Sequence, residues 1–250
     1  MNYSLTDIPN SGPNPMIYMD LTVNNKPQGR IYIKLFRDAF PAGVENFLEI
    51  AAGSTQRAGP VNPAMPCDLK VIPRTYVDSK FYNFLFNNYL VGGDIYNNNG
   101  SNAGTIYNDQ SIPFNAKNAV FYPHHKPGLI SLIPYDESED IGNTGNSEDC
   151  LMYDSTFMIT LDAMPELDHG QIVIGEIYEG IEHIEKINSM IQPHAGRRYP
   201  DIRIADSGIH RRGIKPNALL NLKTKNATRF IQAPRLRRGA NLVISEYVSC

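Results

Sequence analysis

The side chains that serve metal sites and hydrolytic sites are present in this 250-residue sequence, but their spacing assembles neither kind of site. Among six histidines, the one adjacent pair, His124 and His125, would point to opposite faces of a strand. The acidic run at 136–140 lacks the spacing and the glycine of a calcium-binding EF-hand loop. No Gly-x-Ser-x-Gly elbow is present to expose a serine nucleophile. We therefore expect no metal, no cofactor and no hydrolase chemistry.

The stretch 79–94 combines closely spaced aromatic side chains with an abrupt Gly-Gly-Asp end. Gly92 and Gly93 permit a tight turn or a close approach of another backbone, and Asp94 follows them. Aromatic residues of this spacing suit a half-buried pleated strand. They are Phe81, Tyr82, Phe84 and Phe86. The pattern predicts an aromatic-rich strand that forms part of a β-barrel wall.

Two kinds of apolar periodicity predict the elements that hold this strand in place. Residues 16–23 and 30–36 alternate apolar and polar side chains, and the short segment 24–29 joins them as an antiparallel hairpin. Residues 44–51 instead carry an apolar stripe at helical spacing, with Pro41 near its start and Gly53 at its end. A second stripe follows Gly180, at Ile181, Ile184, Ile187 and Ile191. The sequence therefore predicts two helices among many short strands.

Composition limits the compartment in which the protein works. The first sixteen residues are polar, with neither the basic start nor the apolar run of a signal peptide, and no apolar stretch reaches 18 residues. Cys67, Cys150 and Cys250 are odd in number and far apart, which favours free thiols in a reducing compartment. We expect an intracellular, cytoplasmic protein that is neither secreted nor bound to a membrane.

The net charge of −3 conceals an acidic body and a basic tail. Residues 211–250 hold nine Lys and Arg and a single acid, whereas the other residues hold 14 bases and 25 acids. Three interpretations of the tail stay open: a solvated arm, a segment that wraps a neighbouring subunit in a homo-oligomer, and a nucleic-acid-binding arm. Nucleic acid is the least favoured partner, because only Phe230 and Tyr247 could stack on bases and the acidic body would repel phosphate.

Several of these segments, taken in chain order, resemble the cyclophilins, the family of peptidyl-prolyl cis-trans isomerases that binds cyclosporin. The resemblance covers residues 16–209. Within the family, the chain also resembles a divergent member from a giant DNA virus of amoebae. It implies a mainly β fold: an eight-stranded antiparallel β-barrel capped by two α-helices. The segments are 16–23, 30–36, the helix with Glu45-Asn46-Phe47, the 79–94 run, Pro127-Gly128-Leu129-Ile130-Ser131-Leu132, 155–160 and 167–175.

The resemblance also implies a mechanism that needs no nucleophile. Rotation about an X-Pro bond faces a barrier of about 20 kcal/mol because the amide is conjugated, and catalysis requires only that the twisted state be bound better than the planar ones. Cyclophilins are understood to donate a hydrogen bond from an arginine to the prolyl nitrogen. The family's Phe-His-Arg is here Phe81-Tyr82-Asn83, so a short neutral amide stands at the catalytic position.

Other positions of the implied peptide-binding site are also changed. Asn88 and Tyr89 replace the aromatic and the methionine of the proline cup, and Val91 replaces a glutamine. Ser155 falls on a second glutamine, Glu166 on the tryptophan that contacts cyclosporin, and Gln171 on a histidine. Gly100, Phe157 and Leu167 are retained. The scaffold residues of the family are retained, while most of the implied catalytic and peptide-binding residues differ.

Segments outside the family pattern divide the chain further. We expect an N-terminal extension at 1–15, a cyclophilin-like domain at 16–209, and a basic C-terminal extension at 210–250. Insertions at 54–77 and 134–154 are too polar for a core. They are interpreted either as solvated loops or as surfaces that shape a partner site beside the pocket.

These observations lead to one main functional hypothesis. The protein is expected to be a weak or non-catalytic cyclophilin that binds proline-containing segments or assembles through its extensions. The alternatives are a working isomerase that assists protein folding, and a protein whose tail binds nucleic acid. The viral resemblance adds the virion as a second place where the protein would be found.

Overall fold

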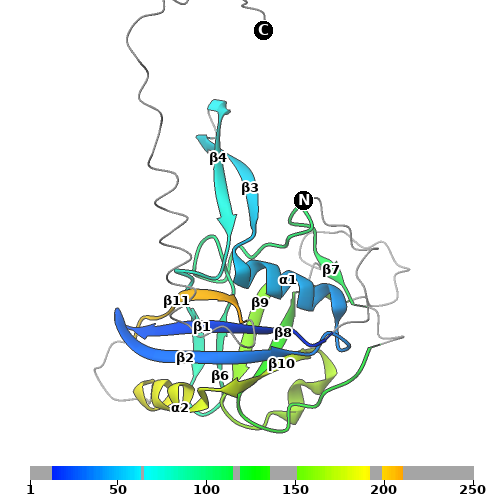
Figure 1. The fold of residues 1–250 in the computed structure, drawn as a ribbon, viewed down its shortest axis with the longest axis vertical. Helices are drawn as coiled ribbons and strands as arrows, with labels where there is room; N and C mark the ends of the chain where they lie inside the picture. The colour runs from blue at the N-terminus through cyan, green and yellow to red at the C-terminus, as the bar shows by residue number, and fades with distance from the viewer. Residues whose placement is uncertain (1–12, 63–64, 115–118, 136–150, 192–198, 211–250) are drawn as a thin grey trace, which may run out of the picture. The chain divides into compact units, whose positions relative to one another are not determined.

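A computed structural model describes residues 13–62, 65–114, 119–135, 151–191 and 199–210, and most of them belong to one curled antiparallel sheet (Figure 1). The strands of this sheet follow the order β11-β1-β2-β10-β8-β9-β6-β5, and β7 pairs with β9. Their bounds are β1 Met16–Val23, β2 Lys26–Leu35, β5 Asn83–Leu85, β6 Tyr89–Gly92, β7 Ile112–Pro113, β8 Leu129–Tyr135, β9 Met152–Thr160, β10 Ile172–Glu179 and β11 Ile202–Ile209.

The two ends of this sheet are joined by the segment 78–81, which runs into β5. The backbone N–H of Phe81 donates to the carbonyl of Ile202, and the N–H of Ile204 donates to the carbonyl of Ser79. Lys80 and Arg203 form an antiparallel bridge at the same place. The prediction of a mainly β, barrel-like antiparallel fold is confirmed, although the sheet has nine strands rather than eight.

Alternation of side chains fixes which face of β1 and β2 meets the core. Ile17 and Met19 on β1 are fully buried, as are Ile31 and Ile33 on β2. The two strands are joined by a tight turn in which both asparagines have positive φ, 50° at Asn24 and 62° at Asn25. The predicted hairpin is therefore present, with β2 starting at Lys26 rather than at residue 30.

The two predicted helices are both present, at opposite ends of the curled sheet (Figure 1). Helix α1 spans Pro41–Ala52; its proline lies in the first turn, where no intrahelical N–H is needed, and Gly53 ends it with φ of 62°. Helix α2 spans Ile181–Met190 and buries Ile184 and Ile187. A 3-10 helix, η3, covers Pro165–His169.

Edge-to-face aromatic packing fills the core between α1 and the sheet. The ring of Phe157 lies 5.1 Å from that of Phe47, 5.3 Å from that of Tyr76 and 5.9 Å from that of Phe81. All four side chains are fully buried. Each such pair contributes about 1 kcal/mol beyond the area that it buries, so this cluster anchors α1 to β9.

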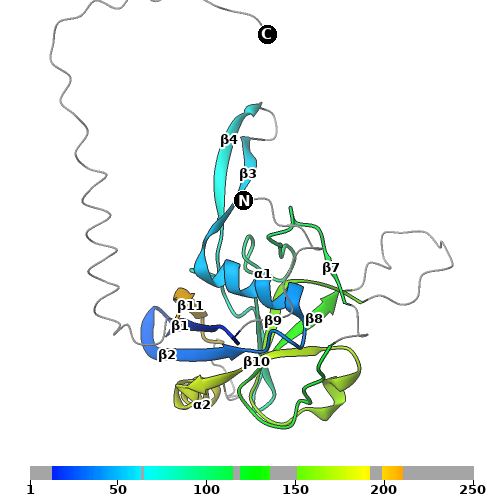
Figure 2. The same cartoon turned by 45° about the vertical axis from the view of Figure 1, so that its right-hand side comes forward.

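The structure corrects the interpretation of the segment 54–77 as a loop too polar for the core. It forms a hairpin of strands β3 Thr55–Asn62 and β4 Met65–Arg74, which pair only with each other (Figures 1 and 2). The residues after the hairpin enter the body: Arg74 is 6% exposed and Tyr76 is fully buried. The polar insertion therefore ends before Arg74.

The second predicted insertion, 134–154, overlaps strands at both of its ends. Pro134 and Tyr135 continue β8, while β9 begins at Met152 and Tyr153 is fully buried. The acidic residues at 136–150 lie outside the described residues, as do residues 1–12 and the basic tail at 211–250. The chain divides into the units Met1–His210 and Arg211–Cys250, and all the elements above belong to the first.

The aromatic run at 79–94 is a bent hairpin rather than one strand. Strand β5 turns at Asn87, whose φ is 60°, and returns as β6, so that Leu85 faces Tyr89. Phe81 is fully buried and Phe84 is half-buried, in line with the prediction of a half-buried barrel wall. In the described part of the chain, no helix has the length and apolar character needed to span a bilayer.

Candidate functional site

One row of paired residues crosses the outer face of the sheet and carries the predicted catalytic position. Asn83 on β5 pairs with Val91 on β6, Val91 pairs with Met158 on β9, and Met158 pairs with Ser131 on β8. Directly paired residues share a face of a sheet. The adjacent row contains Phe157 and Leu132 and points into the core, so the Asn83 row points away from it.

The exposure of this row falls steeply from its edge inward. Asn83 is exposed, whereas Val91 is 6% and Met158 is 4% exposed. Tyr89, at the start of β6, and Asn88, in the preceding turn, are half-buried. The outer face therefore offers an accessible amide at its edge and little open apolar surface beside it.

Tyr82 forms the second part of this surface. Its ring lies so close to Gly100 that a Cβ there would meet the Tyr82 Cε2 at 2.7 Å, and Gly100 has φ of 89°. On the neighbouring strand β9, the backbone N–H of Thr156 donates to Asp154 Oδ1 at 2.6 Å. Burial raises the pKa of both Tyr82 and Asp154. Tyr82, Thr156 and Asp154 were not among the residues expected at the site.

Asp94 organises the loop that presents Gly100. Its fully buried carboxylate accepts hydrogen bonds from a series of backbone N–H groups. The donors are Tyr96, Asn97, Asn99, Gly100 and Ser101, at 2.8–3.1 Å. Burial alone would raise the pKa of Asp94, but these donors outweigh it and lower the pKa.

The structure turns two of the expected site residues inward. Ser155 is fully buried, and its hydroxyl donates to the carbonyl of Gly93 at 2.6 Å. Phe157 is fully buried in the aromatic core. Because side chains alternate along a strand, their neighbours Thr156 and Met158 occupy the outer face instead. The sequence contains a signal for this orientation: Phe157 lies an even number of residues from the apolar Tyr153 and Ile159, so all three share one face of the strand.

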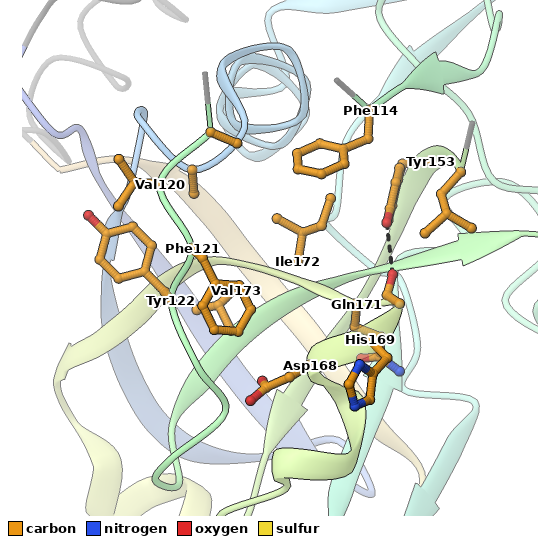
Figure 3. A pocket seen from close by; sticks show the side chains of 14 residues that line it. Phe114, Val120, Phe121, Tyr122, Tyr153, Asp168, His169, Gln171, Ile172 and Val173 are labelled. Atoms are coloured by element: carbon orange, nitrogen blue, oxygen red, sulfur yellow. Dashed lines mark hydrogen bonds between the residues drawn. The ribbon is translucent and has the colours of Figure 1, made fainter. Parts of the chain in front are cut away.

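The remaining expected residues lie toward η3 and β10. Glu166 is exposed and Leu167 is half-buried, both on η3, while Gln171 immediately precedes β10. In the order of the sheet, β6, β9 and β8 separate β10 from β5. The structure thus gathers Asn83, Val91 and Gly100 at one side of the sheet and places Gln171 at a separate cavity beyond β8 (Figure 3).

A buried Ser-His-Asp arrangement links β8 to η3. His124 Nδ1 lies 2.6 Å from Asp168 Oδ1, and His124 Nε2 lies 2.8 Å from Ser131 Oγ. The geometry resembles a hydrolytic triad, but His124 and Ser131 have no exposed surface and no substrate could reach the hydroxyl. The backbone N–H of His124 also donates to Asp168. We interpret the arrangement as a structural link that fixes η3 against β8.

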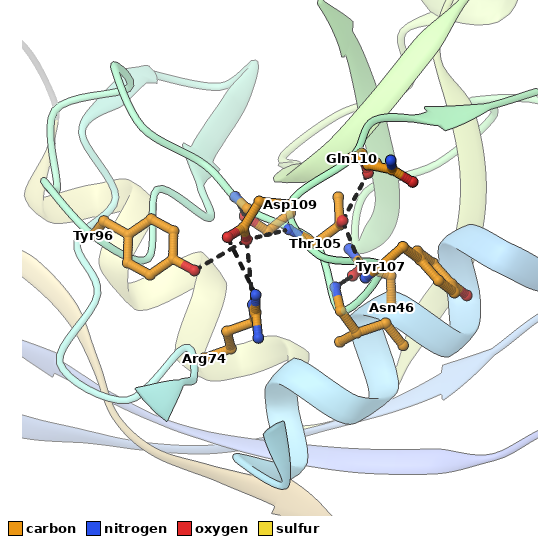
Figure 4. A network of polar contacts seen from close by, with 10 residues as sticks. Asn46, Arg74, Tyr96, Thr105, Tyr107, Asp109 and Gln110 are labelled. Atoms are coloured by element: carbon orange, nitrogen blue, oxygen red, sulfur yellow. Dashed lines mark hydrogen bonds and ion pairs between the residues drawn. The ribbon is translucent and has the colours of Figure 1, made fainter. Parts of the chain in front are cut away.

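A second polar network holds the loop before β7 and the end of β4 (Figure 4). Arg74 contacts Asp109 through two nitrogens, each 3.2 Å from a different carboxylate oxygen. Tyr96 donates to the same carboxylate. Asn46, on α1, accepts from the N–H of Ile106 at 2.8 Å. The network ties α1, the base of the β3–β4 hairpin and the loop 96–110 together behind the outer face.

Cation ligands do not gather in the described part of the chain. No group of three or more His, Cys, Asp or Glu side chains is placed there to hold a metal ion. The acidic run at 136–140, Cys150 and Cys250 fall outside that part.

Comparison with known proteins identifies the fold. The family model described as cyclophilin type peptidyl-prolyl cis-trans isomerase/CLD matches residues 18–209. The chain belongs to the cyclophilin family. The family inferred from the sequence motifs is therefore confirmed.

Among its relatives, this cyclophilin resembles a viral protein over almost its whole length. It is 47% identical to the structural PPIase-like protein of Acanthamoeba polyphaga mimivirus over 240 residues, covering 94% of this chain and 98% of the relative. A crystal structure of the mimivirus cyclophilin matches with a TM-score of 0.67 and 48% identity, covering 84% of this chain and 96% of that chain.

Cellular relatives match only the central part of this cyclophilin. The NK-tumor recognition protein of Mus musculus is 29% identical over 195 residues, which are 78% of this chain and 12% of that protein. The peptidyl-prolyl cis-trans isomerase D of Kluyveromyces lactis is 27% identical over 195 residues, covering 46% of its length.

Proposed function

We propose that this cyclophilin binds proline-containing peptide segments and isomerises them weakly or not at all. The observation that carries the proposal is Asn83, which stands on the exposed edge of the outer face at the position where the family pattern has an arginine. The proposal deepens the family assignment by asking what chemistry the substituted site retains.

The reduced activity follows from what a donor must do in the twisted state. As the X-Pro bond rotates, a lone pair localises on the prolyl nitrogen, and a charged donor aimed at it stabilises that state more than the planar one. The Asn83 amide is neutral and shorter than a guanidinium. Loss of one such donor costs about 3 kcal/mol, or roughly a hundredfold in rate.

Burial beside Asn83 supports the same proposal. Val91 and Met158 form the next two positions of the row, and together they expose little surface to a proline ring. A shallow apolar surface gives a ligand less buried area, and therefore less affinity, than a deep cup. The mimivirus relative is named a structural PPIase-like protein, which is consistent with a role other than efficient catalysis.

NMR exchange spectroscopy on a short Ala-Pro peptide tests the proposal. The wild-type protein is expected to shift peptide resonances without accelerating cis-trans exchange appreciably above the uncatalysed rate. Asn83→Arg is expected to gain exchange activity if the rest of the face still positions the peptide. Leu85→Arg is the matched control, because it places the same charge on β5, two residues away and 49% exposed in the native protein.

The rival function is efficient isomerisation with Asn83 or a neighbouring group as the donor. Rapid exchange catalysed by the wild-type protein would establish that rival and refute the proposal. An inert wild type whose resonances do not respond to the peptide would remove the binding part of the proposal. Equal gains in both arginine variants would show a nonspecific effect of charge.

A further inference from the structure

An apolar cavity of about 200 Å³ lies between β10, η3 and the segment that precedes β8 (Figure 3). Its floor is formed by Tyr153, Ile172 and Val173, and the Tyr153 hydroxyl donates to the carbonyl of Gly170 at 2.8 Å. In sheet order, β6, β9 and β8 separate this cavity's strand from the strand that carries Asn83. None of Asn83, Val91, Met158 and Ser131 lines the cavity, so it lies apart from Asn83, although Val173 pairs with Ser131 and therefore belongs to the same outer face of the sheet.

The rim of the cavity exposes large apolar side chains. Phe121 is 64% exposed, Val120 is 45% exposed and Leu151 is 39% exposed, and all three line the cavity. An exposed Phe side chain beside a cavity of this kind is shielded from water when another molecule covers it, and the burial of its apolar surface is favourable. The rim is built to gain free energy from an apolar group.

A buried polar acceptor lies in the same cavity. Gln171 lines it, and the Gln171 Oε1 atom is buried without a hydrogen-bond donor among the described residues. A buried acceptor without a donor is unfavourable, because it has lost its hydrogen bonds to water and gained none in the protein. A ligand N–H that reached this oxygen would recover that free energy, which favours a peptide over a purely hydrocarbon ligand.

The charges around the cavity are acidic. Asp168 lines it, and the exposed Asp38 accepts both its hydrogen bonds from the hydroxyl of the lining Tyr122. No Lys or Arg is among the described residues that line it. A cationic ligand would therefore be attracted here.

We propose that this cavity binds an extended basic peptide segment, with one aromatic or large aliphatic side chain against Phe121 and a backbone N–H donated to Gln171 Oε1. Lys or Arg residues beside the anchor face Asp38 and Asp168. This occupant needs no proline, so its binding is measured separately from that of proline-containing peptides at Asn83.

Fluorescence anisotropy with proline-free peptides tests the proposal on the full-length protein. The probe is the fluorescently labelled peptide Gly-Lys-Arg-Phe-Lys-Gly. Two partner peptides serve as controls: one carries Ser in place of Phe, and the other carries Glu in place of the three basic residues. The basic Phe peptide is expected to bind at least about tenfold more tightly than either partner. Raising the salt concentration to about 0.5 M is expected to weaken it further.

Three single substitutions locate the binding. Phe121→Ser is expected to lower the affinity about tenfold, whereas Tyr178→Ser, at a residue 62% exposed on β10 and outside the cavity lining, leaves it unchanged. Gln171→Met keeps the volume, removes the acceptor and is expected to weaken binding several-fold. Circular dichroism checks that each variant is folded.

Several outcomes would overturn the proposal. Equal affinities for the Phe and Ser peptides would show that the Phe side chain does not anchor the peptide. Equal losses of affinity in Phe121→Ser and Tyr178→Ser would show that the peptide does not bind in the cavity. Displacement of the probe by an Ala-Pro peptide would place it on the Asn83 face. If raising the protein concentration increases the mass of the protein assembly and abolishes probe binding, the cavity is occupied by a second copy of the chain.

Discussion

At the residue scale, Asp94 shows how a single buried carboxylate shapes the outer face. Five backbone N–H groups donate to it at 2.8–3.1 Å and a sixth, that of Asn102, at 3.4 Å, and they draw the loop after β6 into a ring that ends at Asn102. Gly100 in turn supports the ring of Tyr82, the residue before Asn83. The position of the candidate site therefore depends on one charge that no ligand touches.

Asp94→Asn is expected to lower the free energy of unfolding by about 2–4 kcal/mol near neutral pH, because the new NH₂ group would face N–H donors. The folded-state pKa of Asp94 is lowered. Its contribution is therefore present above the pKa of the unfolded chain and is lost as the pH falls from the ordinary value of 3.8 through the lowered one. Urea unfolding of both proteins across this range measures the difference.

The control for this experiment is Asp162→Asn, at an exposed residue whose carboxylate accepts from the neighbouring Ala163. It is expected to change the stability by less than about 0.5 kcal/mol. A difference between wild type and Asp94→Asn that does not narrow in acid would contradict the electrostatic explanation.

Motif spacing predicted from sequence which face of the sheet some candidate residues occupy, and it was wrong for others. Asn83 and Val91 could be placed because the Phe81 and Gly-Gly-Asp landmarks lie close on either side. Ser155 and Phe157 were assigned to the ligand face, yet a shift of one residue along a strand reverses the face. Tyr82, Thr156 and Asp154 were missed because their roles depend on contacts between β5, β9 and the Gly100 loop, which spacing along the chain does not reveal.

At the element scale, the β3–β4 hairpin is the part least coupled to the rest of the body. Its strands pair only with each other, and two-stranded sheets are marginally stable on their own. Arg74 fixes its base through the paired contacts with Asp109. In its backbone pairing the hairpin is thus separate from the main sheet, and the described contacts attach it at its end.

Replacing residues 57–72 with two glycines is expected to change the free energy of unfolding by less than about 1 kcal/mol, since the element that is lost can open locally without disturbing the core. Arg74→Met, a single substitution, is expected to cost more, about 2 kcal/mol, because it leaves a carboxylate short of its cation. Chemical denaturation followed by circular dichroism compares the two. A shortened protein less stable than Arg74→Met would show that the hairpin supports the barrel.

Prolines explain why the hairpin was interpreted as a loop while the helices were recognised. Pro60 lies within β3, and Pro66 and Pro73 lie within β4, and a proline in a strand argues against a central position in a sheet. Both strands here are edge strands, where a missing N–H can face away from the partner. The stripes of α1 and α2 carried no such conflict, so their bounds agree with the sequence to within a residue or two.

At the scale of the whole molecule, closure of the barrel limits how the chain can associate. The segment 78–81 covers the free edge of β11, so this edge of the main sheet is already paired in the body. Another copy of the chain could then add a strand at the β3–β4 hairpin, or bind through charge to the acidic surface of the body. The sequence supplies a complementary partner for that surface in the nine bases of residues 211–250.

Light scattering on the full chain and on residues 1–210 is expected to give a mass above one 28.0 kDa protomer for the first and the mass of one protomer for the second. The physical reason is attraction between the acidic body of one copy and the basic tail of another. Salt screens this attraction, because the Debye length falls from about 10 Å at 0.1 M to about 3 Å at 1 M. Added salt is therefore expected to lower the mass of the full chain toward that of one protomer. Residues 1–210 contain every described strand and helix, so the shorter chain retains the core. Equal masses would eliminate association through the tail, and salt-sensitive retention of the full chain alone on a nucleic-acid column would assign the tail to nucleic acid instead.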